Sequence, residues 1–228
     1  MNSIAQRLEI VRERITHAER QAGRPPGSVQ LLAVSKTRPI NDLRAALTAG
    51  QTRFGESYLQ DALPKIATLA DAPIEWHFIG PIQSNKSREI AEHFAWVHSV
   101  ERLKIARRLS EQRPAELPPL NICLQINTSG EASKAGVSPD EALALARSVA
   151  DLPHLKLRGL MTIPAPAGDF EQQRVPFRQL RELFEQLNAE GLALDTLSMG
   201  MTDDLEAAIA EGSTIVRIGT AIFGARAK

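Results

Sequence analysis

The chain has 228 residues, and its 27 Lys plus Arg balance 27 Asp plus Glu, so the formal net charge is zero. A neutral chain has no global field that draws in polyanions, which argues against a nucleic-acid coat protein or a membrane-surface protein. Hydrophobic residues make up 43% and charged residues 24%. This composition supports a buried core and excludes disorder as the main state.

The cysteine content and the N-terminal residues both indicate a soluble cytoplasmic protein. Cys123 is the only cysteine, which excludes an internal disulfide and a multi-cysteine metal site and is consistent with a reducing compartment. Residues 1–21 alternate Glu and Arg with apolar residues, unlike the continuous apolar core of a signal peptide. No stretch approaches the eighteen apolar residues that would span a membrane.

Apolar residues at three- and four-residue steps predict an amphipathic helix over residues 1–21, which ends at Gly23 and the pair Pro25 and Pro26. Eight short apolar or β-branched runs follow and are predicted as strands: 29–35, 52–55, 74–80, 96–100, 120–127, 155–163, 196–200 and 214–219. Seven helical segments lie between them: 41–49, 57–67, 85–91, 101–111, 139–150, 172–189 and 203–210.

Strands that alternate with helices are typical of βαβ units and a parallel sheet. Eight such units in this length predict a closed (β/α)8 barrel with an extra N-terminal helix, formed as one domain by residues 1–228. A doubly wound open sheet is the alternative. In a barrel the active site lies at the C-terminal ends of the strands, so the polar residues at those positions are the candidates for function.

Lys36 comes directly after the first predicted strand, at the end of an apolar run. Low-dielectric surroundings lower the pKa of a lysine and free its amine as a nucleophile toward aldehydes. The alternative is an ordinary surface lysine just past a strand.

His77 lies inside an apolar run, which favours a hydrogen-bonded core histidine over a catalytic base. His93 and His98 are five residues apart and do not share a helical face, so we expect no metal site there. Asn85 is a candidate cap for the helix that follows it.

The last two units indicate a phosphate site. The seventh strand ends with Ser198 and Gly200, and the eighth ends with Gly219 and Thr220. Barrels commonly bind phosphate with the loops after these two strands and a helix N-terminus. Hydroxyl groups and backbone amides without an obstructing side chain suit this task, although two ordinary turns would show the same residues.

Arg217 interrupts the apolar eighth strand. A buried arginine needs an acceptor. The sequence leaves two acceptors open, a carboxylate in the core or a ring nitrogen of a ligand.

Several segments, in order along the chain, together resemble the YggS/PROSC family of pyridoxal phosphate (PLP) homeostasis proteins, whose fold is similar to the N-terminal barrel of alanine racemase. The resemblance runs from about Met1 to Arg226. The segments that carry it are residues 33–37, 54–56, 77–80 with 83–86, 159–161, 198–201 with 203–204, and 216–220 with 222–224.

The resemblance implies a role for each matching residue. Lys36 would form the internal Schiff base, a covalent aldimine with PLP, and Arg217 would face the pyridine nitrogen. Met161 would line the pocket. Ser198, Gly200, Gly219 and Thr220 would hold the phosphate.

The chain departs from the family at two positions. We expect Ser57 to be one of the cofactor-binding residues. The family usually has Asn at this position, so this chain lacks the side-chain amide that Asn would supply there. Thr202 stands where Ser is usual, a change that we expect to preserve helix capping.

Three functions are compared. The first is a non-catalytic protein that buffers PLP or delivers it to apo-enzymes, with no catalytic residue of its own. The second is an amino-acid racemase, which needs acid–base groups on both faces of the bound amino acid. Lys36 can serve one face, but the chain has a single tyrosine, Tyr58, and no room for the second domain of a racemase. The third, a Schiff-base aldolase acting on a phosphorylated sugar, would share the lysine and the phosphate loops.

An arginine can only donate, which favours an unprotonated ring nitrogen and weakens PLP as an electron sink. We therefore expect the carrier, as a monomer that binds neither nucleic acid nor membrane.

Overall fold

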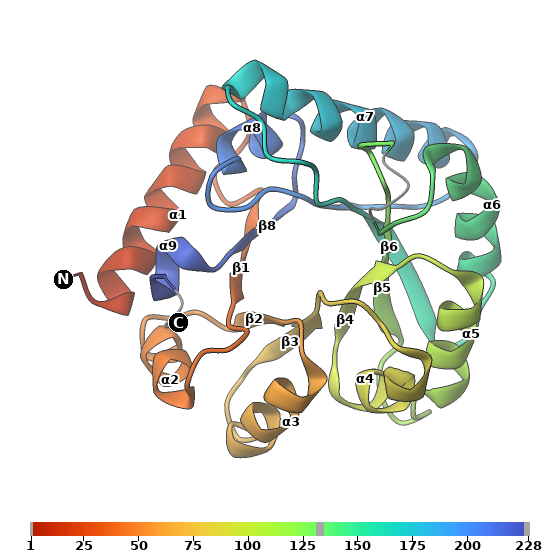
Figure 1. Ribbon diagram of the computed structural model, residues 1–228, viewed down its shortest axis with the longest axis horizontal. Helices are drawn as coiled ribbons and strands as arrows, with labels where there is room; N and C mark the ends of the chain where they lie inside the picture. Colours follow the sequence, from red (N-terminus) through yellow and green to blue (C-terminus); the bar gives the residue numbers. More distant parts are fainter. Residues whose placement is uncertain (1, 131–134, 226–228) are drawn as a thin grey trace.

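The computed structural model describes residues 2–130 and 135–225, and its centre is a closed barrel of parallel strands (Figure 1). The strands follow one another around the barrel in chain order, and β8 pairs with β1 to close it. The predicted (β/α)8 barrel is therefore confirmed, and the open sheet is wrong. The strand bounds are β1 Gln30–Val34, β2 Arg53–Glu56, β3 Glu75–Phe78, β4 Trp96–Val100, β5 Leu120–Gln125, β6 Leu155–Met161, β7 Thr196–Ser198 and β8 Ile215–Ile218.

Helices surround the barrel and cover its outer face (Figure 1). A 3-10 turn, Ser84–Lys86, precedes the fourth of them. The helix bounds are α1 Ile4–Gln21, α2 Ile40–Thr48, α3 Leu59–Thr68, α4 Ser87–His93, α5 Leu103–Gln112, α6 Pro139–Ala150, α7 Phe170–Ala189, α8 Leu205–Ala210 and α9 Thr220–Phe223.

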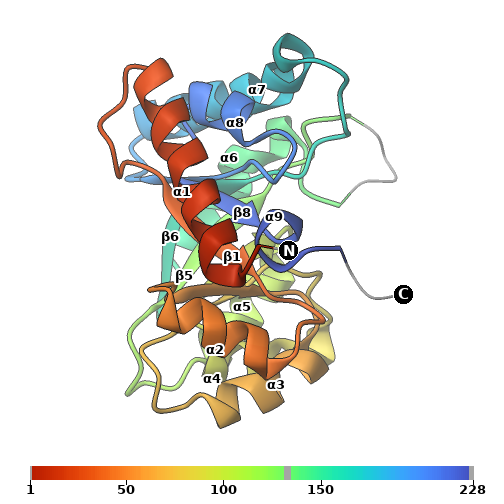
Figure 2. The ribbon, with the colours of Figure 1, turned by 90° about the vertical axis from the view of Figure 1, so that its left-hand side faces the viewer.

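Helix α1 begins with a capping box: the Gln6 N–H donates to the Ser3 hydroxyl, and the Ser3 N–H donates to the Gln6 side chain. Its buried face carries Leu8, Val11 and Ile15. The helix packs on α2, α8 and α9, and Figure 2 shows it beside the last two. Because these helices follow β1, β7 and β8, α1 covers the side of the barrel where the first and last strands meet.

Side chains alternate between the two faces of each strand. Outward-pointing residues such as Phe54, Val97 and Val216 pack against the helices in the main hydrophobic core. A smaller cluster of Trp96, Cys123 and Met161 lies inside the barrel. The interior of the barrel is therefore a packed core rather than an open channel.

The observed boundaries differ from the predicted ones mainly at the C-terminal ends of strands. Strand β7 ends at Ser198 rather than at Gly200 because Gly200 has a φ of +96°, which turns the chain out of the sheet. Helix α8 begins at Leu205, and Asp204 rather than Thr202 is its N-cap. The capping predicted for Thr202 is therefore wrong.

Two other local features differ. Asn85 lies inside the 3-10 turn, and Lys86 occupies the N-cap position of α4, so the capping role suggested for Asn85 is wrong. Helix α9 was not predicted, because its four residues are too few to show a helical period. Across residues 2–130 and 135–225, no helix is both long and apolar enough to cross a membrane. The same ranges contain no group of three His, Cys, Asp or Glu that could hold a metal ion.

Candidate functional site

Lys36 lies in a tight turn that directly follows β1. The Arg38 N–H donates to the Ser35 carbonyl at 3.0 Å, which closes the turn. Thr37, the third residue of the turn, has a φ of +61°, a left-handed conformation that is costly for a β-branched side chain. The lysine itself is half-buried. The chain therefore presents Lys36 from a strained turn at the C-terminal end of the barrel.

A buried charged group lies beneath this turn, and sequence reasoning missed it. Glu56 ends β2, and Lys65 lies on the inner face of α3. The Lys65 Nζ is 2.9 Å from Glu56 Oε1. The signal in the sequence was present, because Glu56 follows an apolar strand and Lys65 lies on the apolar face of an amphipathic helix. Neither residue could be paired with the other from the sequence alone.

Arg217 lies inside the barrel, and its neighbours in the sheet are β7 and β1. Its Nη1 donates to the carbonyl and hydroxyl oxygens of Ser198 at 2.5 and 2.9 Å, and its Nη2 donates to the Thr162 carbonyl at 2.8 Å. The acceptors of the buried guanidinium are therefore oxygens of Ser198 and Thr162, and not the core carboxylate that the sequence allowed as one alternative. The bonds use three of the five N–H donors of a guanidinium, so donors remain for a ligand at the strand ends.

The charge of Arg217 survives its burial. Desolvation lowers the pKa of Arg217 to about 10, while the negative charge of Asp204 raises it. A group with this pKa is protonated at neutral pH. Arg217 is therefore a permanent donor, and it cannot accept a proton from a ring nitrogen.

Two histidines continue the hydrogen-bonded chain through the barrel interior. The His98 Nδ1 is 2.7 Å from the Ser198 hydroxyl, and the His98 Nε2 is 2.9 Å from His77 Nδ1. The His77 Nε2 is 3.0 Å from the Glu75 carboxylate, and the ring stacks on Trp96 at an interplanar angle of 4°. His77 is therefore a hydrogen-bonded core histidine, as predicted. Its pairing with His98 was not predicted.

Burial determines the charge state of these rings. Desolvation lowers the pKa of His77, although Glu75 opposes the shift. Desolvation also lowers the pKa of His98 well below its usual value, and the nearby His77 and Arg217 add to the effect. Both rings are therefore neutral at pH 7, whereas Arg217 keeps its positive charge.

The glycines of the last two loops allow close backbone approaches. A Cβ at Gly219 would lie 3.3 Å from the Val34 carbonyl oxygen, so glycine lets the β8–α9 connection pass close to β1 just before Lys36. A Cβ at Gly200 would lie 2.6 Å from the Ala208 Cβ of α8. Gly200 also accepts the Arg217 N–H at 2.9 Å through its carbonyl. Thr220 is exposed and begins α9, whose first amides have no acceptor within the helix.

The remaining predicted residues flank this group. Met161 ends β6, pairs in register with Ser198 and is fully buried in the barrel interior. The Ser198 hydroxyl is also buried and is bonded to Arg217 and His98. Ser57 follows β2 and is half-buried. The structure thus brings Lys36, Gly200, Gly219 and Thr220 to one end of the barrel, whereas Met161 and Ser198, the latter also a predicted phosphate residue, are buried below the surface.

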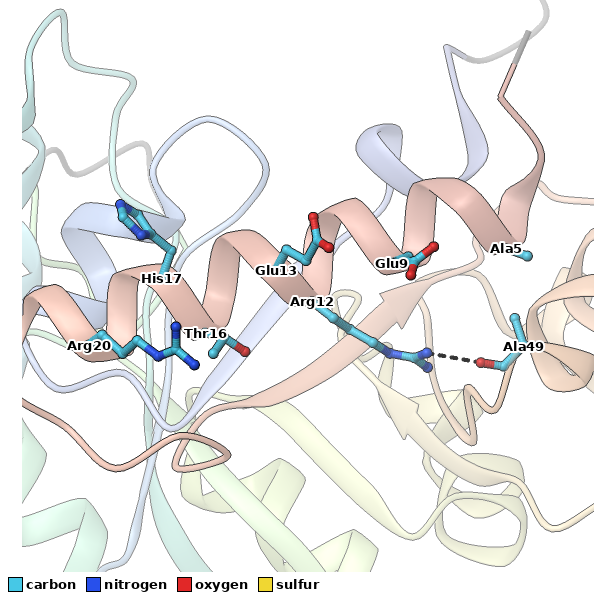
Figure 3. A pocket seen from close by; sticks show the side chains of 8 residues that line it. All are labelled: Ala5, Glu9, Arg12, Glu13, Thr16, His17, Arg20 and Ala49. Atoms are coloured by element: carbon cyan, nitrogen blue, oxygen red, sulfur yellow. Dashed lines mark hydrogen bonds between the residues drawn. The ribbon is translucent and has the colours of Figure 1, made fainter.

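Pockets are present both at and away from this end of the barrel. A cavity of about 250 Å³ lies at the strand ends and is lined in part by Ile79, Ser99, Gln125 and Ile163. A pocket of about 560 Å³ lies on the outer face of α1, where Arg12 donates to the Ala49 carbonyl at 2.9 Å (Figure 3). None of the predicted site residues lines either of these pockets. We place the candidate site at the strand ends because Lys36 follows β1 there and Gly219 and Thr220 follow β8.

The residues present are suited to PLP. The turn supplies a primary amine, and Arg217 supplies N–H donors from inside the barrel that suit a ring nitrogen as acceptor. The Gly219 backbone leaves room that a side chain would fill. A helix N-terminus stabilises an anion such as phosphate. The donor set therefore matches an aldehyde, a ring nitrogen and a phosphate.

Comparisons with known proteins point in the same direction. The family model described as "Alanine racemase, N-terminal domain" matches residues 7–227. The pyridoxal phosphate homeostasis protein of Pseudomonas aeruginosa is 63% identical over 226 residues, covering 99% of this chain and 97% of that protein. The structure of PipY from Synechococcus elongatus with PLP bound has a TM-score of 0.82 and 38% identity, over 97% of this chain and 100% of that one.

A more distant likeness concerns the fold alone. Alanine racemase from Corynebacterium glutamicum has a TM-score of 0.69 at 17% identity, over 97% of this chain and 62% of that one. The barrel, the family model and the full-length similarity agree with one another. The chain therefore belongs to the family of pyridoxal phosphate homeostasis proteins, which share the fold of the alanine racemase N-terminal domain.

Proposed function

We propose that this protein holds PLP as a Schiff base on Lys36 and buffers it or delivers it to apo-enzymes in the cytoplasm, without turning over amino acids. The observation that carries the proposal is the adjacency of β1 and β8. In the β1–β8 register Arg217 lies opposite Leu32, and Gly219 approaches Val34, two residues before Lys36, which supports a site shared by these two strands. The PLP-bound PipY structure supports the same ligand.

Each residue has a distinct task in this proposal. Lys36 provides the amine that forms the covalent link, and Arg217 donates to the ring nitrogen. The backbone at Gly200 and Gly219, together with Thr220 and Ser198, holds the phosphate. Met161 and Ser57 bound the site from below and from the β2 side. PLP itself supplies a reversible aldehyde and an electron-withdrawing ring.

Arg217 is also the reason to favour binding over turnover. Its guanidinium is charged at neutral pH and has no lone pair to accept a proton. A pyridine nitrogen opposite it stays unprotonated, which weakens the withdrawal of electrons from a bound amine. Tyr58, the single tyrosine of the chain, has an exposed fraction of 53% at the start of α3. Tyr58 is therefore not the second acid–base group that a racemase needs in a site shielded from water.

The absorption spectrum tests the proposal. We expect the purified protein to be yellow, and borohydride reduction should bleach the band and place the label on Lys36 in a peptide map. Lys36→Ala should lose the label at this position, whereas Lys86→Ala, a lysine on the nearby 3-10 turn, should retain it on Lys36. A colourless protein, or label on another residue of the wild type, would overturn the assignment.

Two further measurements separate carrier from racemase. Incubation with single-enantiomer amino acids and chiral chromatography should show no more racemisation than free PLP at the same concentration. Transfer to an apo-enzyme should proceed in the presence of a PLP trap that captures freely diffusing cofactor. Turnover well above free PLP would identify an enzyme instead. Gel filtration of the same sample tests the expected monomer.

A further inference from the structure

A buried ion pair lies behind the lysine turn. The side chains of Glu56 and Lys65 have exposed fractions of 0% and 4%. The Lys65 ammonium is 2.9 Å from Glu56 Oε1 and 2.7 Å from Asp61 Oδ2, one turn earlier on α3. Asp61 is about one-third exposed and connects this pair to the surface. The three charged groups therefore form one connected cluster between β2 and α3.

This cluster bonds to the backbone on both sides of Lys36. On the N-terminal side, the Ser35 hydroxyl donates to Glu56 Oε1 at 2.6 Å, and Lys65 donates to the Ser35 carbonyl at 2.9 Å. On the C-terminal side, the Thr37 N–H donates to Asp61 Oδ2 at 2.7 Å. The residues that flank the reactive lysine are thus held by the same three side chains.

Stability alone is a poor explanation for this arrangement. Buried ion pairs often contribute no more than apolar residues of the same volume, because both charges lose their hydration. Glu56 also has a second carboxylate oxygen, Oε2, that is buried without a hydrogen-bond partner among the described residues. Burial accordingly raises the pKa of Glu56, although Ser35 and Lys65 oppose the shift.

The strain in the turn gives the cluster a task. Thr37 is held at a φ of +61°, where glycine or asparagine is usual at the third position of a turn. Such strain persists only where the surrounding structure imposes it. The Asp61 bond to the Thr37 N–H imposes it directly, and Lys65 holds both Asp61 and the Ser35 carbonyl at the start of the turn.

We propose that Glu56, Lys65 and Asp61 are positioning residues that clamp the Ser35–Arg38 turn and thereby fix the direction from which Lys36 meets PLP. The proposal rests on the proposed function, in which Lys36 holds the cofactor. The described contacts of the clamp are with Ser35 and Thr37, the neighbours of Lys36 in the chain. The clamp therefore acts on how firmly the cofactor is held and not on the chemistry of the amine.

Four full-length variants test the clamp. Asp61→Ala removes the acceptor for the Thr37 N–H, and Asp61→Asn restores an oxygen at the same place. Glu56→Gln removes the buried charge. Glu211→Gln is the matched control, because Glu211 is 2% exposed and bonds to three arginines of α7 at 2.7 to 3.3 Å, far from the Lys36 turn in the fold. Thermal melting of each variant establishes that it is folded.

Two rates are the readouts measured on these proteins, and a circular dichroism spectrum complements the second of them. Hydrogen exchange of the PLP-free protein follows the peptide that contains residues 35–38. The rate of PLP release from the loaded protein to a trap follows the cofactor, and circular dichroism in its absorption band reports how it is oriented. The first readout does not depend on PLP binding, so failure of the proposed function and failure of the clamp are distinguishable.

We expect faster exchange in the 35–38 peptide of Asp61→Ala, and PLP release accelerated by about tenfold, since small displacements of a reacting group have large effects. Asp61→Asn should return both readouts toward the wild-type values. Glu56→Gln should accelerate release and alter the dichroism, whereas Glu211→Gln should change the melting temperature alone.

The proposal is overturned if folded Asp61→Ala exchanges and releases PLP like the wild type, or if Glu211→Gln changes both readouts as much as Asp61→Ala does. Because Asp61 is partly exposed, the Asp61 variants decide the matter even if Glu56→Gln does not fold.

Discussion

Arg217 illustrates how the barrel interior holds a charged donor in one orientation. Its donors are bonded to Ser198 and to the Thr162 carbonyl, which holds the planar guanidinium in one orientation. The neutral rings of His98 and His77 lie behind Ser198. Ser198 therefore connects the arginine to the histidine pair, and its hydroxyl orients Arg217 in addition to the phosphate role that we propose for this residue.

The exchange of Arg217 for lysine tests this geometry. A lysine keeps the positive charge, but its ammonium is compact and lies at the end of a flexible side chain. It therefore cannot donate to Ser198 and Thr162 at the same time in the way that the planar guanidinium does. We expect Arg217→Lys to lose about 1–3 kcal/mol of unfolding free energy, because at least one buried carbonyl is left without a donor. Urea unfolding of the PLP-free protein measures this difference in unfolding free energy. A variant as stable as the wild type would show that these bonds contribute little.

At the scale of secondary-structure elements, the connection from β7 to α8 brings together helix packing, Arg217 and the predicted phosphate loop. Asp204 occupies the N-cap position of α8, and its carboxylate accepts the Met201 N–H at 2.6 Å within the preceding loop. Gly200 lies against Ala208 of the same helix and bonds to the Arg217 backbone. The loop is therefore held at both of its ends by contacts within the protein.

Gly200→Ala should disturb this connection for two separable reasons. Its φ of +96° is unfavourable for alanine, and the new Cβ would lie 2.6 Å from Ala208. We expect a loss of about 2–4 kcal/mol of stability, in which strain and overpacking add, together with weaker PLP binding. Gly191→Ala is the control. Gly191 has a φ of +92°, and a Cβ added there would have no atom within 4 Å, so this variant introduces the backbone strain without overpacking. Equal losses in the two variants would contradict the role of the α8 contact.

At the scale of the whole molecule, closure of the barrel brings distant residues into one interior. The hydrogen-bonded chain from Glu75 through His77, His98 and Ser198 to Arg217 joins β3, β4, β7 and β8. Each member lies on a different strand except for the first two. This series of hydrogen bonds therefore exists only when the barrel is closed, so the protonation of its members is coupled to global folding.

The pH dependence of stability follows from the two histidines. Both have lowered pKa values in the folded protein because burial disfavours the charged ring, whereas an unfolded histidine titrates at about 6.5. Below that pH the unfolded chain binds protons that the folded chain does not, so the unfolding free energy falls as the pH drops from 7 to 5.

The measurement compares the wild type with His98→Gln by urea unfolding at several pH values. We expect the variant to be less stable at pH 7 but to lose about 1–2 kcal/mol less than the wild type between pH 7 and pH 5. Parallel pH profiles for the two proteins would contradict a neutral buried His98.

Much of the fold and part of the site were accessible from the sequence. The alternation of apolar runs with amphipathic segments predicts the barrel, because side-chain periodicity depends on neighbours a few residues apart. The position of Lys36 after β1 and the charge of Arg217 within β8 are local features of the same kind. The ends of β7 and α8 were predicted less well, because the φ of Gly200 and the cap at Asp204 depend on contacts between the loop and the helix.

Sequence alone therefore determined the class of fold and the family, and it predicts which residues would bind an aldehyde and a phosphate. The partners of those residues were decided only by the tertiary structure. Glu56 and Lys65 meet beneath the turn, and His77 meets His98, because strands and helices that are separate along the chain become neighbours when the barrel closes. A buried polar group needs a partner, but its sequence position does not reveal which distant residue supplies it.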